Sequence, residues 1–441
     1  MKYFLMTSQL PGRKQLGYLT LAMLLLLAGC SPADNEFAAP QPSPDEDQGL
    51  GRTESAKVDN NFAHLLNTYP QARLSPTPWA GHWWPYTDNG IASSKYTEKK
   101  SPAARYDAAH GKKTQAQSWE ASNHGAHVPH VEGWWGHCNG WCAAAALYPE
   151  PKTQSVVNGV SFSVLDIKAL LTEAGMRASA DYFGSPVVTP GDYQTGAYRD
   201  TVPNQVFLVL THFIGKQNKA VLFDRYTGYQ KWNQPLAGYK ITYPTPADVI
   251  APSAEAPNIH RIQVTMTLWY VNDNWISESE SPPFNYEDSY DGVYVSRELK
   301  SELWLDGPIT FDAQGKMVSS GNIVLTRDPS DTRYWVGGAW LMGDVENDGW
   351  PDYMWVPYAI LPSDANDNNP FVDINWLTEH LLPPGGRDDP NFTGTSPDDP
   401  PSPSPAPSAS PTHSPLPIPS IVPVPSHTPV PSPSPQVSPH P

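Results

Sequence analysis

Hydrophobic and polar residues alternate most regularly over residues 262–270. Every second residue there is apolar and most of the residues between them are polar: Ile262, Val264, Met266, Leu268 and Tyr270 against Gln263, Thr265 and Thr267. Successive side chains of a strand point to opposite faces, so the pattern predicts a strand with one buried face.

Shorter runs rich in β-branched and aromatic residues predict further strands, at residues 206–210, 220–223, 299–305 and 322–325. Residues 215–218 (GKQN), between the first two runs, are typical of a turn. We therefore expect these two strands to form a hairpin.

Two other stretches have helical patterns. Four consecutive alanines at residues 143–146 favour a helix that begins near Cys138. Over residues 166–174, Ile167, Leu170 and Leu171 recur at the spacing of one helix face. A helix followed by antiparallel strands is an α+β arrangement. We predict that the Cys138 helix packs on an antiparallel sheet.

The N-terminus has the features of an export signal. Residues 1–29 place basic residues before a short apolar run, which is typical of a secretory signal peptide. The sequence LAGC at residues 27–30 resembles a bacterial lipoprotein signal, in which Cys30 is lipidated and becomes the first residue. In such lipoproteins Ser31, in place of aspartate, favours the outer membrane. We expect a lipid anchor without a spanning segment.

Composition divides the rest of the chain. Residues 30–75 are polar and predict a tether, residues 76–382 are globular in composition, and residues 383–441 are Pro/Ser repeats that predict a disordered tail. Most of the 50 prolines belong to the ends, and the formal net charge is −17. This acidic balance argues against a nucleic-acid partner.

The cysteine count indicates free thiols. With Cys30 lipidated, Cys138 and Cys142 remain, four residues apart on the predicted helix. Their Cβ atoms would lie about 5–6 Å apart, which exceeds the roughly 3.5–4.5 Å of a disulfide. Two free thiols in an exported protein indicate a reactive or metal-binding use.

Cys138 is the candidate nucleophile. In the first turn of a helix, unpaired N–H groups and the helix dipole favour an anion, so the thiol is expected to ionise readily. The alternative is an inert, buried cysteine. Trp134, Trp135 and Trp141 are expected to line the cleft or to belong to the core.

A cysteine nucleophile needs a base and a group that orients it. His212 and Asp224 end the two strands of the predicted hairpin, so we expect them to meet as base and orienting acid. His137, beside Cys138, is a competing base, as are His124, His127 and His130.

Zinc is an alternative use of the same residues. Cys138 and Cys142 would bind it with one or two of His124, His127, His130 and His137. A second well-spaced pair of ligands is missing, so zinc is not the expected cofactor.

Calcium is the expected cofactor. Acidic side chains occupy positions 1, 3, 5 and 9 of a possible calcium loop, with Gly349 at position 6: Asp344, Glu346, Asp348 and Asp352. Position 12 is Trp355, so a complete helix–loop–helix site is not predicted. An acidic, solvated loop is the alternative.

Several blocks in order resemble the transglutaminase elicitor family. Besides the Cys138 block they are residues 77–85 (TPWAGHWWP), 101–107 (SPAARYD), 158–162 (NGVSF), 166–170 (DIKAL), 232–235 (WNQP), 337–340 (GGAW) and 351–355 (PDYMW). The resemblance implies a calcium-dependent cysteine acyltransferase that joins a protein glutamine to a primary amine. The family's nucleophile matches Cys138, and its aspartate matches Asp224.

One position departs from the family. Aligned on Gly215, the histidine expected to act as base falls on Phe207, and the family's asparagine falls on His212. The base has either moved to His212 or been lost. We therefore expect a lipid-anchored transglutaminase-like enzyme of a Gram-negative cell envelope. The alternatives are a silent binding protein with the same fold, or a thiol hydrolase or amidase.

Overall fold

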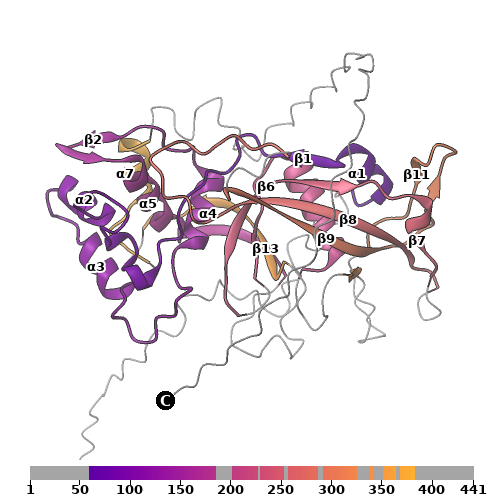
Figure 1. Ribbon diagram of the computed structural model, residues 1–441, viewed down its shortest axis with the longest axis horizontal. Coiled ribbons are helices and arrows are strands. Elements are labelled where there is room, and N and C mark those ends of the chain that lie inside the picture. The colour runs from indigo at the N-terminus through magenta and orange to yellow at the C-terminus, as the bar shows by residue number, and fades with distance from the viewer. Residues whose placement is uncertain are drawn as a thin grey trace, which may run out of the picture. The chain divides into compact units, whose positions relative to one another are not determined.

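A large antiparallel sheet lies at the centre of the described residues (Figure 1). The computed structural model describes residues 59–184, 201–226, 229–252, 257–286, 292–324, 337–341, 351–363 and 368–382. All of them belong to one compact unit of the chain. The fold is α+β, as predicted.

The sheet has the strand order β12-β9-β8-β6-β5-β13-β4, with β1 added to β6 and β7 to β8. Its nine strands are β1 (Gln71–Arg73), β4 (Ala178–Gly184), β5 (Leu222–Asp224), β6 (Asn233–Thr242), β7 (Val249–Ile250), β8 (His260–Val271), β9 (Tyr294–Leu305), β12 (Ala339–Trp340) and β13 (Tyr353–Ile360). Two hairpins stand apart from it, formed by β2 (Ser155–Val157) with β3 (Val160–Phe162) and by β10 (Thr310–Phe311) with β11 (Met317–Ser319).

Seven α-helices occur in the described ranges: α1 (Phe62–Thr68), α2 (Pro102–Ala109), α3 (Ala116–Asn123), α4 (Cys138–Leu147), α5 (Val164–Gly175), α6 (Pro203–Val209) and α7 (Ile374–His380). The π-helical turn η4 (Leu210–Lys216) continues α6, and 3-10 turns are η1 (Tyr86–Asp88), η2 (Gly90–Ala92) and η5 (Pro246–Asp248). Among these residues, no helix combines the length and apolar character that crossing a bilayer requires.

Alternating side chains of the sheet enter two hydrophobic clusters. On β5, Leu222 belongs to the cluster around α4 and α5, while Phe223 belongs to the cluster around α6. On β13, Trp355 and Met354 divide in the same way. Since neighbouring residues of a strand face opposite sides, the sheet is buried on both faces here.

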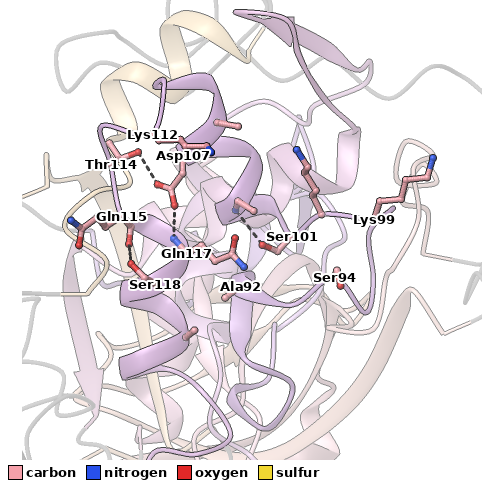
Figure 2. Close-up of a pocket in the computed structure, with 14 residues that line it drawn as sticks. Ala92, Ser94, Lys99, Ser101, Asp107, Lys112, Thr114, Gln115, Gln117 and Ser118 are labelled. Carbon is pink, nitrogen blue, oxygen red and sulfur yellow. Dashed lines mark hydrogen bonds between the residues drawn. The ribbon is translucent and has the colours of Figure 1, made fainter.

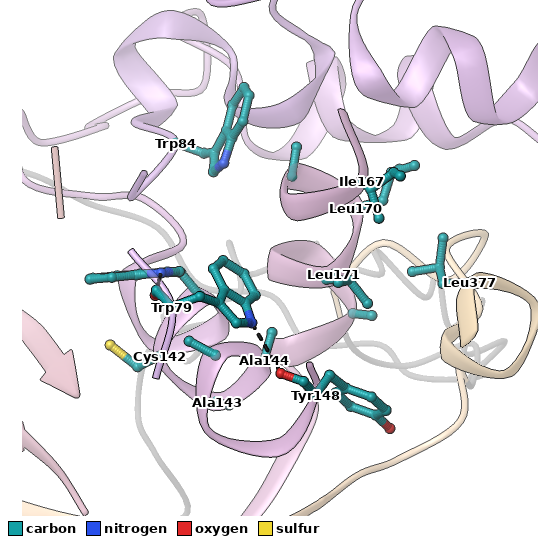
Figure 3. Close-up of a cluster of buried hydrophobic side chains, with 14 of the residues drawn as sticks. Trp79, Trp84, Cys142, Ala143, Ala144, Tyr148, Ile167, Leu170, Leu171 and Leu377 are labelled. Atoms are coloured by element: carbon teal, nitrogen blue, oxygen red, sulfur yellow. Dashed lines mark hydrogen bonds between the residues drawn. The ribbon is translucent and has the colours of Figure 1, made fainter. Parts of the chain in front are cut away.

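Helix α4 lies in the first of these clusters. Its small residues Ala143 and Ala144 are fully buried, and α4 contacts α5 on one side and β6 and β13 on the other. Figure 3 shows α4 among the large side chains that enclose it, with Nε1 of Trp79 donating to the carbonyl oxygen of Tyr148 at 3.1 Å. Small side chains thus let α4 approach both neighbours closely.

The close approach of α4 and α5 depends on two glycines. A Cβ at Gly140 would overlap the carbonyl oxygen of Thr172, and one at Gly175 would overlap the carbonyl oxygen of Gly140. The two backbones are therefore in contact at this crossing, two residues after Cys138.

Several predicted elements are confirmed. The alternating run at 262–270 is part of β8, residues 299–305 end β9, and residues 166–174 lie within α5. Helix α4 begins at Cys138 itself. Strand β5 overlaps the run predicted at 220–223.

The predicted hairpin is wrong. Residues 206–210 form α6 and the first residue of η4, because Pro203 starts a helix there and every residue of the run is buried. A fully buried run has no polar face, so its periodicity cannot distinguish a strand from a helix.

Two other predictions need correction. The tether was expected to reach residue 75, but α1 and β1 belong to the fold, and Phe62 and Leu66 are fully buried. Of the strand predicted at 322–325, Asn322 and Ile323 make isolated bridges only.

Candidate active site

Cys138 is held at the edge of the buried core. It is the first residue of α4 and only 6% of its surface is exposed. The thiol lies 3.6 Å from the carbonyl oxygen of Lys231, to which it donates, and 3.9 Å from Nδ2 of Asn233, which donates to the sulfur. Both partners come from the start of β6 and the segment before it.

Asn233 is fixed in one orientation. Its Oδ1 accepts from the hydroxyl of Tyr353 at 3.0 Å and from Nε1 of Trp355 at 2.8 Å, both on β13. Because two donors hold the oxygen, the amide nitrogen is directed to Cys138. Asn233 lies in the WNQP block that carries the family resemblance, but no pattern in the sequence marks it as a site residue.

Asp224 lies directly across from Asn233 in the β5–β6 register. Its Oδ1 accepts from the backbone N–H groups of Trp232 at 2.8 Å and Tyr226 at 3.0 Å, while Oδ2 has no hydrogen-bond partner among the described residues. Burial and the neighbouring Asp352 carboxylate raise the pKa of Asp224 well above its usual range. One oxygen of a basic carboxylate is therefore available for proton transfer.

The expected activation of the resting thiol is contradicted. Burial, and then the charges of Asp224 and Asp273, raise the pKa of Cys138 to about 11. These effects outweigh the hydrogen bonds from Asn233, which lower the pKa. The resting thiol is therefore protonated near neutral pH and needs a base.

Alkylation of Cys138 by iodoacetamide in the full chain is expected to rise about tenfold per pH unit, without a plateau, up to about pH 10. Only the thiolate reacts, and the pKa of the thiol is raised to about 11. Peptide mass spectrometry separates Cys138 from Cys142, whose fully buried thiol should barely react and serves as an internal control. A plateau below about pH 8.5, where a free thiol titrates, would contradict this picture.

The structure does not bring His212 to Cys138, so the geometric basis for predicting it as the base is wrong. His212 lies in η4, where its Nε2 donates to the carbonyl oxygen of Asp59 at 2.6 Å. Helix α6 contacts β9, and η4 contacts β1, whereas α4 contacts β6 and β13. Phe207, at the position of the family's histidine, is fully buried on α6 and packs on Phe62 at 5.1 Å between ring centroids.

His137 precedes Cys138 but its ring faces another cluster. Its Nε2 lies 2.6 Å from Glu173 Oε2 and 3.2 Å from Glu120 Oε1. Burial opposes the charge of this ring, but the two carboxylates prevail and raise the pKa of His137 to about 10. A ring that holds its proton this firmly is unsuited to act as the base for Cys138.

The predicted cysteine–histidine zinc site is not formed. Cys142 is a free thiol buried in the core beside Ala143. His127 and His130 are exposed. In the part of the chain that the structure describes, the group of possible metal ligands contains no sulfur: Glu120, His124, His137 and Glu173.

Aromatic side chains pack on residues 229–232, whose Lys231 carbonyl oxygen accepts from the Cys138 thiol. Trp134 is partly buried, and its ring centroid lies 5.7 Å from that of Tyr229 and 6.0 Å from Nζ of Lys231. Trp83 packs on Trp232 at 5.1 Å between ring centroids. Trp141 is fully buried in the core. Of the tryptophans expected to line a cleft, Trp134 is thus the better placed.

The predicted calcium loop falls largely outside the described residues. This applies to Asp344, Glu346 and Asp348. Asp352, the fourth expected ligand, is fully buried immediately before β13 and close enough to Asp224 to raise its pKa.

A separate open pocket lies on the outer side of α2 and α3, with a volume of about 730 Å³ (Figure 2). Asp107 on its wall accepts from Thr114 Oγ1 at 2.7 Å and from the backbone N–H of Gln117 at 3.0 Å, which organises the start of α3. Its lining residues come from residues 92–121, so the pocket does not include Cys138.

Comparison with known proteins agrees with this fold. The crystal structure of the GP42 transglutaminase from Phytophthora sojae is similar, with a TM-score of 0.51, 19% sequence identity, and coverage of 74% of this chain and 93% of that chain. No protein with curated annotation matches the sequence. The family model described as "Transglutaminase elicitor" matches residues 117–367, more than half of the chain, and includes Cys138, Asp224 and Asn233. This chain therefore belongs to the transglutaminase elicitor family.

Proposed function

We propose that this protein is a cysteine acyltransferase that joins the side-chain carboxamide of a protein glutamine to a primary amine. The observation that carries the proposal is the thiol of Cys138 at the start of α4, facing an oriented amide and near a buried carboxylate, in a chain of the transglutaminase elicitor family. Glutamine donors and amine acceptors are the substrates that this family membership favours.

In the proposed reaction Asp224, rather than His212, accepts the proton of the Cys138 thiol. The sulfur bonds to the carboxamide carbon of glutamine and forms a tetrahedral intermediate. Asp224 then returns the proton to the departing nitrogen, ammonia leaves, and a thioester remains. A primary amine loses a proton to Asp224 as it attacks the thioester, and the proton passes to the sulfur when the isopeptide is released.

The developing oxyanion needs hydrogen-bond donors. Nδ2 of Asn233 donates to the reacting sulfur at 3.9 Å, and Tyr353 and Trp355 hold its orientation in advance. The first N–H groups of α4 have no partner within the helix and point out of its N-terminus. These donors would stabilise negative charge on the carboxamide oxygen.

The function is tested by incorporation of a fluorescent primary amine into a glutamine-containing protein. Wild type is expected to incorporate the amine and Cys138→Ala to lose all activity above background. Cys142→Ala is the matched control, because this second thiol is buried in the core and takes no part in the reaction. Equal incorporation by wild type and Cys138→Ala would reject the proposal.

A catalytically silent binding protein is the second candidate, favoured by the raised pKa of Cys138 and by Phe207 at the family's histidine position. It predicts that wild type incorporates no amine and forms no thioester with a glutamine substrate. Release of ammonia without amine incorporation would instead identify an amidase.

We also propose that Asp344, Glu346, Asp348 and Asp352 bind one Ca²⁺ that stiffens the domain. Carboxylate oxygens are hard ligands that suit calcium and do not activate a thiol. Ligand linkage then predicts a stability gain of about 2.7 kcal/mol at a hundredfold excess over the dissociation constant.

Thermal melting in millimolar calcium and in chelator checks this proposal. Asp348→Ala is expected to remove the calcium-dependent shift, whereas Asp312→Ala, in the β10–β11 turn, is expected to retain it. If wild type melts at the same temperature in calcium and in chelator, these acidic residues do not bind calcium and the proposal is rejected.

We propose that the chain is lipid-anchored at Cys30 and works at the outer membrane, on proteins or peptidoglycan-linked amines of the envelope. The LAGC sequence supports this placement. Cys30→Ser is expected to move the protein from the membrane fraction to the soluble fraction.

A further inference from the structure

Four metal-binding side chains converge behind the nucleophile without taking part in its proposed chemistry. Glu120 comes from α3, His124 follows that helix, His137 precedes Cys138, and Glu173 comes from α5. All four are fully buried, and one ligand atom from each lies within 4.8 Å of the others. The cluster therefore joins three helices at the point where α4 begins.

Their spacing fits one four-coordinate ion. Nε2 of His137 lies 3.3 Å from Nδ1 of His124 and 3.2 Å from Oε1 of Glu120, and Oε2 of Glu120 lies 3.2 Å from Nδ1 of His124. Ligands bound to zinc at about 2.0–2.1 Å in a tetrahedron are about 3.3–3.4 Å apart. Glu173, at 2.6 Å from His137, would have to withdraw slightly.

The ring of His137 is oriented as a metal ligand is. Its Nδ1–H donates to the carbonyl oxygen of Trp84 at 3.1 Å, which directs Nε2 into the cluster, where a bound metal ion would replace the Nε2 proton. A histidine that binds a metal commonly donates its other N–H to a backbone carbonyl in this way. Tyr86 stacks on His124 at 4.3 Å between ring centroids and keeps that ring in place.

One carboxylate oxygen of Glu173 points into the cluster. Glu173 Oε2 is buried, and Nε2 of His137 lies 2.6 Å away as its ion-pair partner. Its other oxygen accepts from the backbone N–H of Asn369 at 2.9 Å. A buried carboxylate needs a positive charge beside it, and a metal ion bound by the histidines would supply that charge.

The second carboxylate is held from behind as well. Oε1 of Glu120 accepts from the backbone N–H of Ile91 at 3.2 Å, and a Cβ at Gly90 would overlap the same oxygen. Backbone groups thus position both carboxylates before any ion binds, which is the usual function of groups surrounding a metal site.

The charges of the two glutamates would be balanced by a divalent metal ion. The ion pairs of Glu120 and Glu173 within the described ranges are with histidines alone. One imidazolium would leave a net negative charge in the core, and two would place like charges at facing nitrogens 3.3 Å apart. A divalent cation bound to two carboxylates and two neutral imidazoles has no net charge.

We propose that Glu120, His124, His137 and Glu173 bind one zinc ion, which ties α3, α4 and α5 together behind Cys138. Imidazole nitrogen is a poor ligand for calcium and magnesium, and a closed set of four protein ligands is typical of structural zinc. This site is independent of the proposed acyl transfer and of the calcium loop.

Metal analysis of the full chain tests the site. Protein produced with zinc in the medium and dialysed against a chelating resin is expected to retain about one zinc per chain. X-ray absorption should show only nitrogen and oxygen neighbours at about 2.0 Å. Zinc below about a tenth of an equivalent, or a sulfur shell at about 2.3 Å, would overturn the proposal.

Variants assign the ligands. Glu173→Gln and His124→Asn are expected to lose the zinc, while His130→Asn keeps it, because His130 is exposed and asparagine tolerates its positive φ of 66°. Zinc retained at one equivalent by both ligand variants would refute the ligand set. If a variant does not fold, the zinc content of the wild-type protein still tests whether the metal binds. Zinc content is measured independently of amine transfer, so its result does not depend on the proposed function.

Discussion

Asp224→Asn is expected to lower the rate of amine incorporation by about 10²–10⁴-fold, the range that one general base contributes. The oxygen of asparagine can still accept from the N–H groups of Trp232 and Tyr226, so the loop after β5 should keep its conformation. The variant removes a base without removing the hydrogen bonds that shape the site.

The pH profile separates a base from a structural group. Burial and Asp352 raise the pKa of Asp224, and the carboxylate must be ionised to accept a proton. Wild-type kcat/KM should therefore fall as the pH drops through this raised pKa, and Asp224→Asn should lose that acidic limb.

His212→Asn is the matched control for the base. It removes a hydrogen bond to Asp59 on the far side of the sheet and should leave the rate of amine incorporation within about twofold of wild type. Loss of activity in His212→Asn together with normal activity in Asp224→Asn would return the role of base to the histidine.

Gly140→Ala is expected to destabilise the fold by about 2–3 kcal/mol, in the range measured for overpacked cores. Alanine improves helix propensity by about 1 kcal/mol, which opposes the effect. The new Cβ would, however, overlap the carbonyl oxygen of Thr172 and lie 2.9 Å from the sulfur of Met176. Backbone cannot move aside as a side-chain tip can, so α4 and α5 must separate.

Urea unfolding measures this change. Gly133→Ala is the control, because a Cβ there meets nothing within 4 Å and its φ lies outside the left-handed region. An unfolding midpoint for Gly140→Ala equal to that of wild type would show that the two helices adjust without cost.

Local patterns identified the elements that carry their own signals. The strand over residues 262–270 alternates, and α5 has a serine cap at Ser163 that accepts from Asp166, with the reciprocal bond also present. Helix α6 had Pro203 as a start signal, but its fully buried residues show no periodicity that separates a helix from a strand. The error in α6 then placed His212 on a strand end that does not exist.

The site could be predicted only in part for a related reason. Cys138 could be predicted because it starts a helix, and Asp224 because it ends a strand. The role of Asn233 depends on hydrogen bonds from β13, more than a hundred residues away in sequence. His124 and His137 were recognised as possible ligands, but Glu120 and Glu173 join them only through helix packing. Long-range pairing of this kind leaves no local pattern.

The place of β13 in the sheet also determines when the site is completed. It is the last strand along the described chain, yet it lies between β5 and β4 and supplies both donors that hold Asn233. A chain that emerges from a ribosome or a translocation channel N-terminus first therefore exposes Cys138 and Asp224 well before the strand that organises them. Until residues 353–360 arrive, the nascent chain has Cys138 and Asp224 without the two donors that orient Asn233.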